Sequence, residues 1–121
     1  MITLKTLEKA TAQEVFDQVA SHLLKQGKRS YGGNTCAYRG EEGLKCAAGC
    51  LIADDEYSEK MEGEGWFGLV VRHGVTNRHG VTNRHCSLID TLQTIHDDRS
   101  PNDWVEELKN LAQEYKLNWN L

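Results

Sequence analysis

The segment CAYRGEEGLKCAAGCLI, residues 36–52, is the part of the chain from which the fold is best worked out. It contains three of the four cysteines. Two short arms with apolar residues flank the turn-forming sequence GEEG at 40–43, and this arrangement predicts a short β-hairpin. A two-stranded hairpin is only marginally stable alone in water, so this one must pack against other elements. The small residues at 46–50 predict a buried segment that another backbone approaches closely.

An amphipathic helix is predicted before this segment, at residues 12–26. Thr11 and Glu14 have the spacing of a capping box, in which each side chain pairs with a free backbone amide at the helix start. Apolar residues then recur at helical spacing, and Gly27 supplies a left-handed stop. This pattern typically buries one face of the helix against a core.

Two further helices are predicted after the segment, at residues 84–98 and 101–116, from apolar stripes at helical spacing. A shorter helix is expected to begin at Asp54 or Asp55, and the apolar run at 66–71 fits either a strand or a short buried helix. The 121 residues are enough for one core. We therefore expect an α+β fold that is mostly α-helical, with three to five helices around a short hairpin, in a single globular domain covering residues 1–121.

A duplicated hexamer follows the apolar run. RHGVTN occupies residues 72–77 and again 78–83, and a third copy begins at Arg84. Two copies are too few for a solenoid, so an insertion in a surface loop is the favoured interpretation. If this segment is extended, the even period places Arg72, Arg78 and Arg84 on one face. A lengthened connector would also permit a homo-oligomer in which protomers exchange an element.

Charge is unevenly distributed along the chain. The net charge is −4, but residues 41–64 contain eight acidic and two basic side chains, whereas residues 65–86 contain three arginines and no acid. The acidic band disfavours nucleic acid as a partner, because phosphates would be repelled. No apolar run is long enough for a membrane span, and the N-terminus lacks an export signal. A cytoplasmic protein with reduced thiols and no membrane partner is expected.

The cysteines, histidines and acidic residues are the candidates for metal binding and catalysis. Zinc could be held by the four cysteines with the adjacent His85, but Cys46 and Cys50 are separated by three residues and not by the more diagnostic two. No local signature of a cysteine nucleophile or of an acid–base carboxylate pair accompanies these residues. We therefore predict no metal, no cofactor and no enzymatic activity. The zinc-stabilised module stays an alternative, with Cys36, Cys46, Cys50, Cys86 and His85 as its candidate ligands.

A second alternative is a domain that binds or transforms a small molecule. Its pocket would lie under the hairpin and would be lined by Tyr38, Arg39, Trp66 and His85. Aromatic walls with a few convergent polar groups are typical of such sites.

The motif CxYRGxxGLKCAxGxLI, followed by DDEY and MEG, resembles an uncharacterised family of small proteins from phages, prophages and other bacterial mobile elements. The resemblance implies an accessory protein that binds a host macromolecule, including the case of an inhibitor of host defence. The duplicated hexamer departs from the family pattern. The partner-binding residues expected from the charge distribution are Glu41, Glu42, Asp54, Asp55, Glu56, Glu59, Arg72, Arg78 and Arg84.

Overall fold

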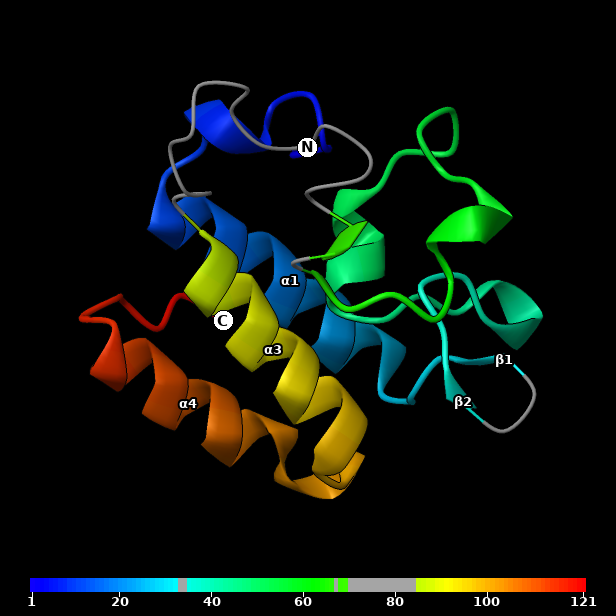
Figure 1. Cartoon of the computed structure of the whole chain (residues 1–121). Helices are drawn as coiled ribbons and strands as arrows, with labels where there is room; N and C mark the ends of the chain where they lie inside the picture. Colours follow the sequence, from blue (N-terminus) through cyan, green and yellow to red (C-terminus); the bar gives the residue numbers. More distant parts are fainter. Residues whose placement is uncertain (33–34, 67, 70–84) are drawn as a thin grey trace.

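The computed structural model describes residues 1–32, 35–66, 68–69 and 85–121 (Figure 1). The described chain is mostly helical, as expected. Its α-helices are α1 (Ala12–Gln26), α3 (Cys86–Asp98) and α4 (Trp104–Glu114). The described chain also contains five short 3-10 turns: η1 (Leu7–Lys9), η2 (Glu41–Gly43), η3 (Ala48–Leu51), η4 (Glu59–Met61) and η5 (Pro101–Asp103). The strands β1 (Tyr31–Gly32) and β2 (Thr35–Cys36) pair antiparallel.

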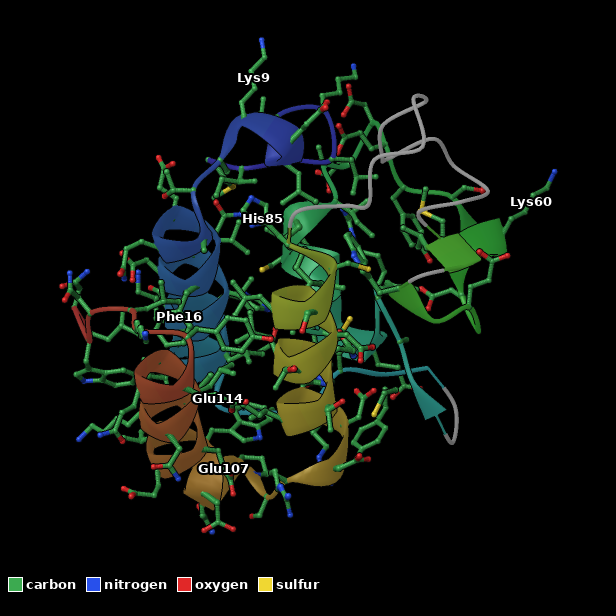
Figure 2. All side chains as sticks on the ribbon, turned by 60° about the vertical axis from the view of Figure 1, so that its left-hand side comes forward. Lys9, Phe16, Lys60, His85, Glu107 and Glu114 are labelled. Atoms are coloured by element: carbon green, nitrogen blue, oxygen red, sulfur yellow. The ribbon has the colours of Figure 1, made fainter. Side chains whose placement is uncertain are left out.

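Helix α1 has the boundaries expected from its sequence signals. The Thr11 hydroxyl accepts a hydrogen bond from the Glu14 backbone N–H, and the Glu14 carboxylate accepts one from the Thr11 backbone N–H. Gly27 ends the helix in a left-handed conformation with φ of 66°. The apolar stripe is buried, including Phe16, which is labelled on α1 in Figure 2.

Helices α1, α3 and α4 pack against one another and contribute most of the buried core residues of the described chain. Trp104, at the start of α4, is fully buried, and its indole N–H donates to the backbone carbonyls of Ile95 and Arg99. This satisfies the one polar atom of a large apolar side chain. The C-terminal tail also returns to the body, because the Trp119 ring lies edge-on to Phe16 at 6.2 Å between ring centroids.

The hairpin expected around residues 40–43 is not confirmed. Residues Glu41–Gly43 form the turn η2, and a single isolated bridge joins Arg39 to Lys45. In the first expected arm, the Glu62 carboxylate accepts the backbone N–H groups of Tyr38 and Arg39 at 2.9 and 3.1 Å. Backbone groups that are already paired with side chains have no need of a neighbouring strand.

The small-residue segment is buried and closely packed, as predicted. It forms η3, which contacts both α1 and α3. A Cβ atom added at Gly49 would lie 2.2 Å from the Tyr38 carbonyl oxygen, so only glycine fits there without a backbone shift.

The helix expected to begin at Asp54 or Asp55 does not form. The chain makes a turn there, and the Glu56 carboxylate accepts backbone N–H bonds from Ala53, Leu4 and Lys5. Of the apolar run, residues 66, 68 and 69 are helical, while the rest of that run and the hexamer repeat lie outside the described residues. No described helix has both the length and the apolar character needed to cross a membrane.

Candidate functional site

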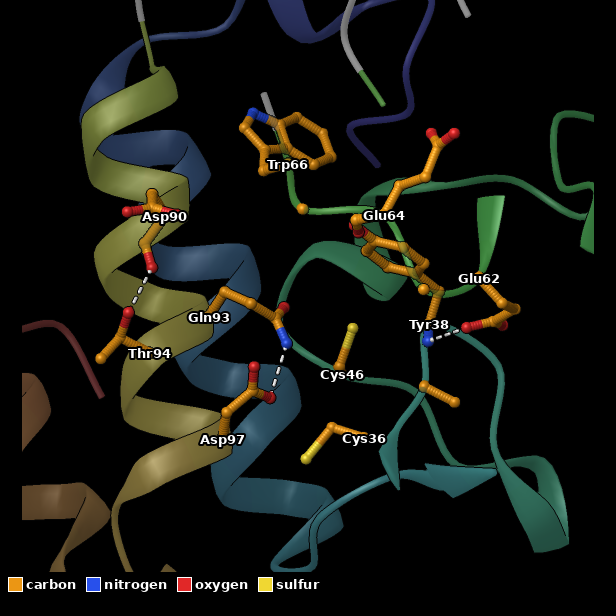
Figure 3. A pocket seen from close by; sticks show the side chains of 13 residues that line it. Cys36, Tyr38, Cys46, Glu62, Glu64, Trp66, Asp90, Gln93, Thr94 and Asp97 are labelled. Atoms are coloured by element: carbon orange, nitrogen blue, oxygen red, sulfur yellow. Dashed lines mark hydrogen bonds between the residues drawn. The ribbon is translucent and has the colours of Figure 1, made fainter. Parts of the chain in front are cut away.

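A pocket of about 290 Å³ lies between α3 and the segment that runs from residue 36 to residue 66. Figure 3 shows the side chains of Asp90, Gln93 and Asp97 along one helix, opposite Tyr38 and Cys46. The described lining residues are Cys36, Ala37, Tyr38, Cys46, Glu62, Gly63, Glu64, Gly65, Trp66, Asp90, Gln93, Thr94 and Asp97. The four residues from α3 are spaced i, i+3, i+4 and i+7, which places them on one face of that helix.

His96 is fully buried next to the pocket and contacts the lining residue Asp97. The backbone N–H of Ser30 donates to Nε2 of His96 at 2.9 Å, so Nε2 carries no proton. Nδ1 lies 2.7 Å from an Asp97 carboxylate oxygen and therefore bears the proton that it donates. The imidazole is thus neutral, with a single tautomer set by its two neighbours, and its ring stacks on Trp104.

A potential metal-ligand group is formed by Cys36, His96 and Asp97, whose donor atoms lie within 4.8 Å of one another. The tautomer of His96 excludes it as a ligand in this arrangement. Binding a metal through Nδ1 would move the proton to Nε2, where it would meet the Ser30 N–H. The described residues therefore give no support to the zinc alternative, since the group they bring together contains only one of the four cysteines.

The thiols are in environments that favour the protonated form. Burial, followed by the nearby Asp97 carboxylate, raises the pKa of Cys36 to about 11. Burial raises the pKa of Cys50 to about 12, and it raises the pKa values of Cys46 and Cys86 as well. A nucleophilic cysteine requires a lowered pKa, so none of the four has the character of a catalytic thiol.

Two other histidines of the described chain are also engaged with the backbone. The His22 ring lies 2.9 Å from the Lys45 carbonyl oxygen, and the His85 ring lies 2.7 Å from that of Ala10. Because a carbonyl only accepts, Nε2 of each ring is the donor. These contacts are those of structural histidines.

Asp97 is held as an ionised carboxylate. Burial works against its charge, but hydrogen bonds from His96, Cys36 and Gln93 outweigh it and lower the pKa of Asp97. Gln93 is itself oriented, because its side-chain oxygen accepts the Ala48 backbone N–H at 2.9 Å while its amide donates to Asp97 at 2.8 Å.

The four residues predicted to line one pocket do not all line the same pocket in the structure. Tyr38 and Trp66 line the pocket described above. Arg39 lines a neighbouring hollow of about 390 Å³ with Tyr57 and Glu59. His85 is buried and is not among the described lining residues of either hollow, because its ring is held at Ala10.

The predicted acidic residues have different environments. Glu41, Glu42, Asp54, Asp55 and Glu59 are exposed. Asp54 forms an ion pair with Arg39 at 2.6 Å, and Asp55 lies 4.0 Å from Lys5.

Glu56 differs from the other predicted acids. Its three backbone hydrogen bonds make it a structural residue that ties the N-terminus to residue 53. A charge reversal at this position would disturb the fold as well as any partner, because three backbone N–H groups would lose their acceptor.

The remaining predicted partner residues, Arg72, Arg78 and Arg84, lie outside the described residues, as does the duplicated hexamer with the exchange of elements expected from it. The residues that sequence reasoning missed are the polar stripe on α3 and Glu62. The i, i+3, i+4, i+7 spacing of Asp90, Gln93, Thr94 and Asp97 was a readable signal, whereas nothing local in the sequence indicated the contacts of Glu62.

No family model, no curated protein and no solved structure matches this chain.

Proposed function

We propose that this chain is a non-enzymatic binding protein that docks on a basic surface of a macromolecular partner. The docking surface, here called the acidic face, consists of the exposed carboxylates Glu41, Glu42, Asp55 and Glu59. The resemblance to proteins of phages and mobile elements makes a cytoplasmic host protein the expected partner. A host-defence protein whose basic surface normally contacts nucleic acid is the specific version of this proposal.

The observation that carries the proposal is that seven of the eight acids of residues 41–64 divide into two groups, one bound within the fold and one exposed. Glu56 and Glu62 are occupied by backbone N–H groups, and Asp54 by Arg39. The acidic face stays exposed on a support that those contacts hold in place. Exposed charge of one sign speeds association with a complementary surface and makes it sensitive to salt.

The backbone at Glu42 supports the same interpretation. Glu42 has φ of 60° and ψ of 23°, in the left-handed region, where glycine is favoured over glutamate. Its side chain is exposed at the tip of η2. A strained conformation that holds an exposed charged side chain is more often found at functional positions than elsewhere.

The chemistry of the described cysteines and histidines supports a binding role and not a catalytic one. The cysteines have raised pKa values, and His22, His85 and His96 have ring nitrogens bonded to the backbone or to Asp97. A nucleophile with an adjacent free base is therefore not assembled among the residues that the structure describes.

The test compares two variants with equal loss of charge. The first replaces the acidic face by neutral isosteres (E41Q, E42Q, D55N, E59Q). The control replaces four exposed acids on or near α4 (D98N, D103N, E106Q, E114Q). Figures 1 and 2 show that α4 lies away from the segment 41–64. Glu56 is left intact in both.

The readout is affinity capture from a bacterial host lysate, followed by mass spectrometry. We expect a host protein that the wild type and the control variant capture, that the acidic-face variant loses, and that raised salt releases. Equal capture by the two variants would contradict the proposal.

A further inference from the structure

We infer that the pocket between α3 and residues 36–66 binds an organic cation, namely an alkylammonium group. Four of its lining residues are acidic, and the described lining residues include no lysine, arginine or histidine. The acids are Glu62, Glu64, Asp90 and Asp97. Clefts lined by charge of one sign, with low-dielectric walls, concentrate ligands of the opposite sign.

Aromatic walls strengthen the case for an organic cation. Tyr38 and Trp66 are almost fully buried, at 6% and 2% exposed, and both line the pocket. The Tyr38 hydroxyl donates to the Glu64 backbone carbonyl at 2.5 Å, so its ring is fixed. Ammonium groups are attracted to the faces of such rings, and alkyl stems pack against them.

The anionic end of the pocket is organised before any ligand arrives. Asp97 receives hydrogen bonds from Gln93 and from the neutral ring of His96. No lysine or arginine of the described chain forms an ion pair with Asp97, although the charge of Arg29 is close enough to interact with it. A half-buried carboxylate held by neutral donors retains capacity for a cationic ligand.

Asp90 completes the geometry from the same helix face. It lies two turns before Asp97 and is exposed, and Figure 3 shows it beside the pocket. The described residues give its carboxylate no ion pair. An alkylammonium ion in the pocket would have the carboxylates of Asp90 and Asp97 on the α3 side and the rings of Tyr38 and Trp66 across from α3.

Size and charge narrow the ligand class. A volume of about 290 Å³ is at the lower end of the range for small-molecule pockets. Phosphates and carboxylates are disfavoured, because they would meet the carboxylates of Asp90 and Asp97 on the α3 side of the pocket. A metal ion is disfavoured, because the tautomer of His96 leaves Cys36 and Asp97 as the remaining donors of the ligand group.

Two sources could supply the alkylammonium group. It could be a free small amine, or it could be a lysine side chain of the macromolecular partner, in which case the inference rests on the proposed function. The first arm of the experiment tests the shared chemistry with the protein alone. The second arm separates the sources.

In the first arm, n-butylammonium chloride is titrated into the isotopically labelled protein and followed by NMR. We expect saturable shifts of the Gln93 side-chain amide and the Trp66 indole signals, with a dissociation constant on the order of 1 mM or tighter. Neutral n-butanol should produce none. D90N should weaken binding about tenfold or more, whereas the exposed pair variant E41Q/E42Q should bind like the wild type.

The outcomes of this arm are decisive. Absence of saturable shifts, equal affinity of D90N and wild type, or an equal loss in E41Q/E42Q would overturn the inference. So would zinc chloride producing the saturable response while n-butylammonium does not. Far-UV circular dichroism checks that D90N is folded.

The second arm uses D90N in the capture experiment. If D90N loses the captured protein while its acidic face is intact, the pocket receives a lysine of the partner. If D90N still captures it, the ligand is a free amine. If the acidic-face variant loses capture but no amine binds, the proposed function stands and the pocket inference fails.

Discussion

Replacing His96 by leucine tests whether this histidine is a structural residue. Leucine roughly retains the volume and removes both hydrogen bonds. The Ser30 backbone N–H, in a fully buried residue, would lose its acceptor, at a cost of about 1–3 kcal/mol. The ring contact with Trp104 contributes roughly 0.5–1.5 kcal/mol more. Asp97 would also lose a donor, but it is only half-buried and water can replace part of that bond. We expect H96L to lose about 2–4 kcal/mol of unfolding free energy.

The assay is urea unfolding followed by circular dichroism. With a slope of about 2 kcal/mol per M, the expected loss moves the midpoint by about 1–2 M. The matched control is T94A, an exposed position on the same helix, where the change should stay within about 0.5 kcal/mol.

A double-mutant cycle isolates the contact between His96 and Asp97. The double variant H96L/D97L should lose less than the sum of the single variants, because each single change already removes the shared bond. A loss below about 1 kcal/mol in H96L, or strict additivity, would refute the assigned tautomer and bonding.

Three further predictions concern packing, pH and thiol access. G49A should lose about 1–3 kcal/mol by forcing its Cβ against the Tyr38 carbonyl, whereas G65A meets no atom within 4 Å and should unfold at nearly the wild-type urea concentration. Burial lowers the pKa of His22 in the folded protein. As pH falls, His22 therefore takes up a proton in the unfolded chain before it does so in the folded one. The stability that neutral His22 contributes is therefore present above about pH 6.5 and is lost as pH falls below it, and H22Q should lose less than wild type between pH 7 and 5 in thermal melts. Iodoacetamide at neutral pH should label the native protein slowly and all four thiols after unfolding; fast native labelling would contradict the raised pKa values of Cys36, Cys46, Cys50 and Cys86.

The helices were predictable because their signals are local. Thr11, Glu14 and Gly27 lie within one or two turns of the groups they pair with, so reading them required no knowledge of the rest of the fold. The glycine at 49 was also readable as a point of close approach, although its partner, the Tyr38 carbonyl, was not.

The expected hairpin failed for a reason that no local pattern contains. The backbone N–H groups of Tyr38 and Arg39, in the first expected arm, are paired with Glu62, more than twenty residues away. The same holds for the pocket. Asp90 and Asp97 share a helix face and could be grouped from sequence, but their position opposite Tyr38 depends on how α3 packs.

The sequence by itself determined the helical class of this protein, the boundaries of α1 and the concentration of acid between residues 41 and 64. Only the tertiary structure decided which acids are exposed and which bind the backbone, and which tautomer His96 adopts. The physical reason is distance along the chain: capping and periodicity act over a few residues, whereas Glu62 with Tyr38 and His96 with Ser30 meet only after the core has formed.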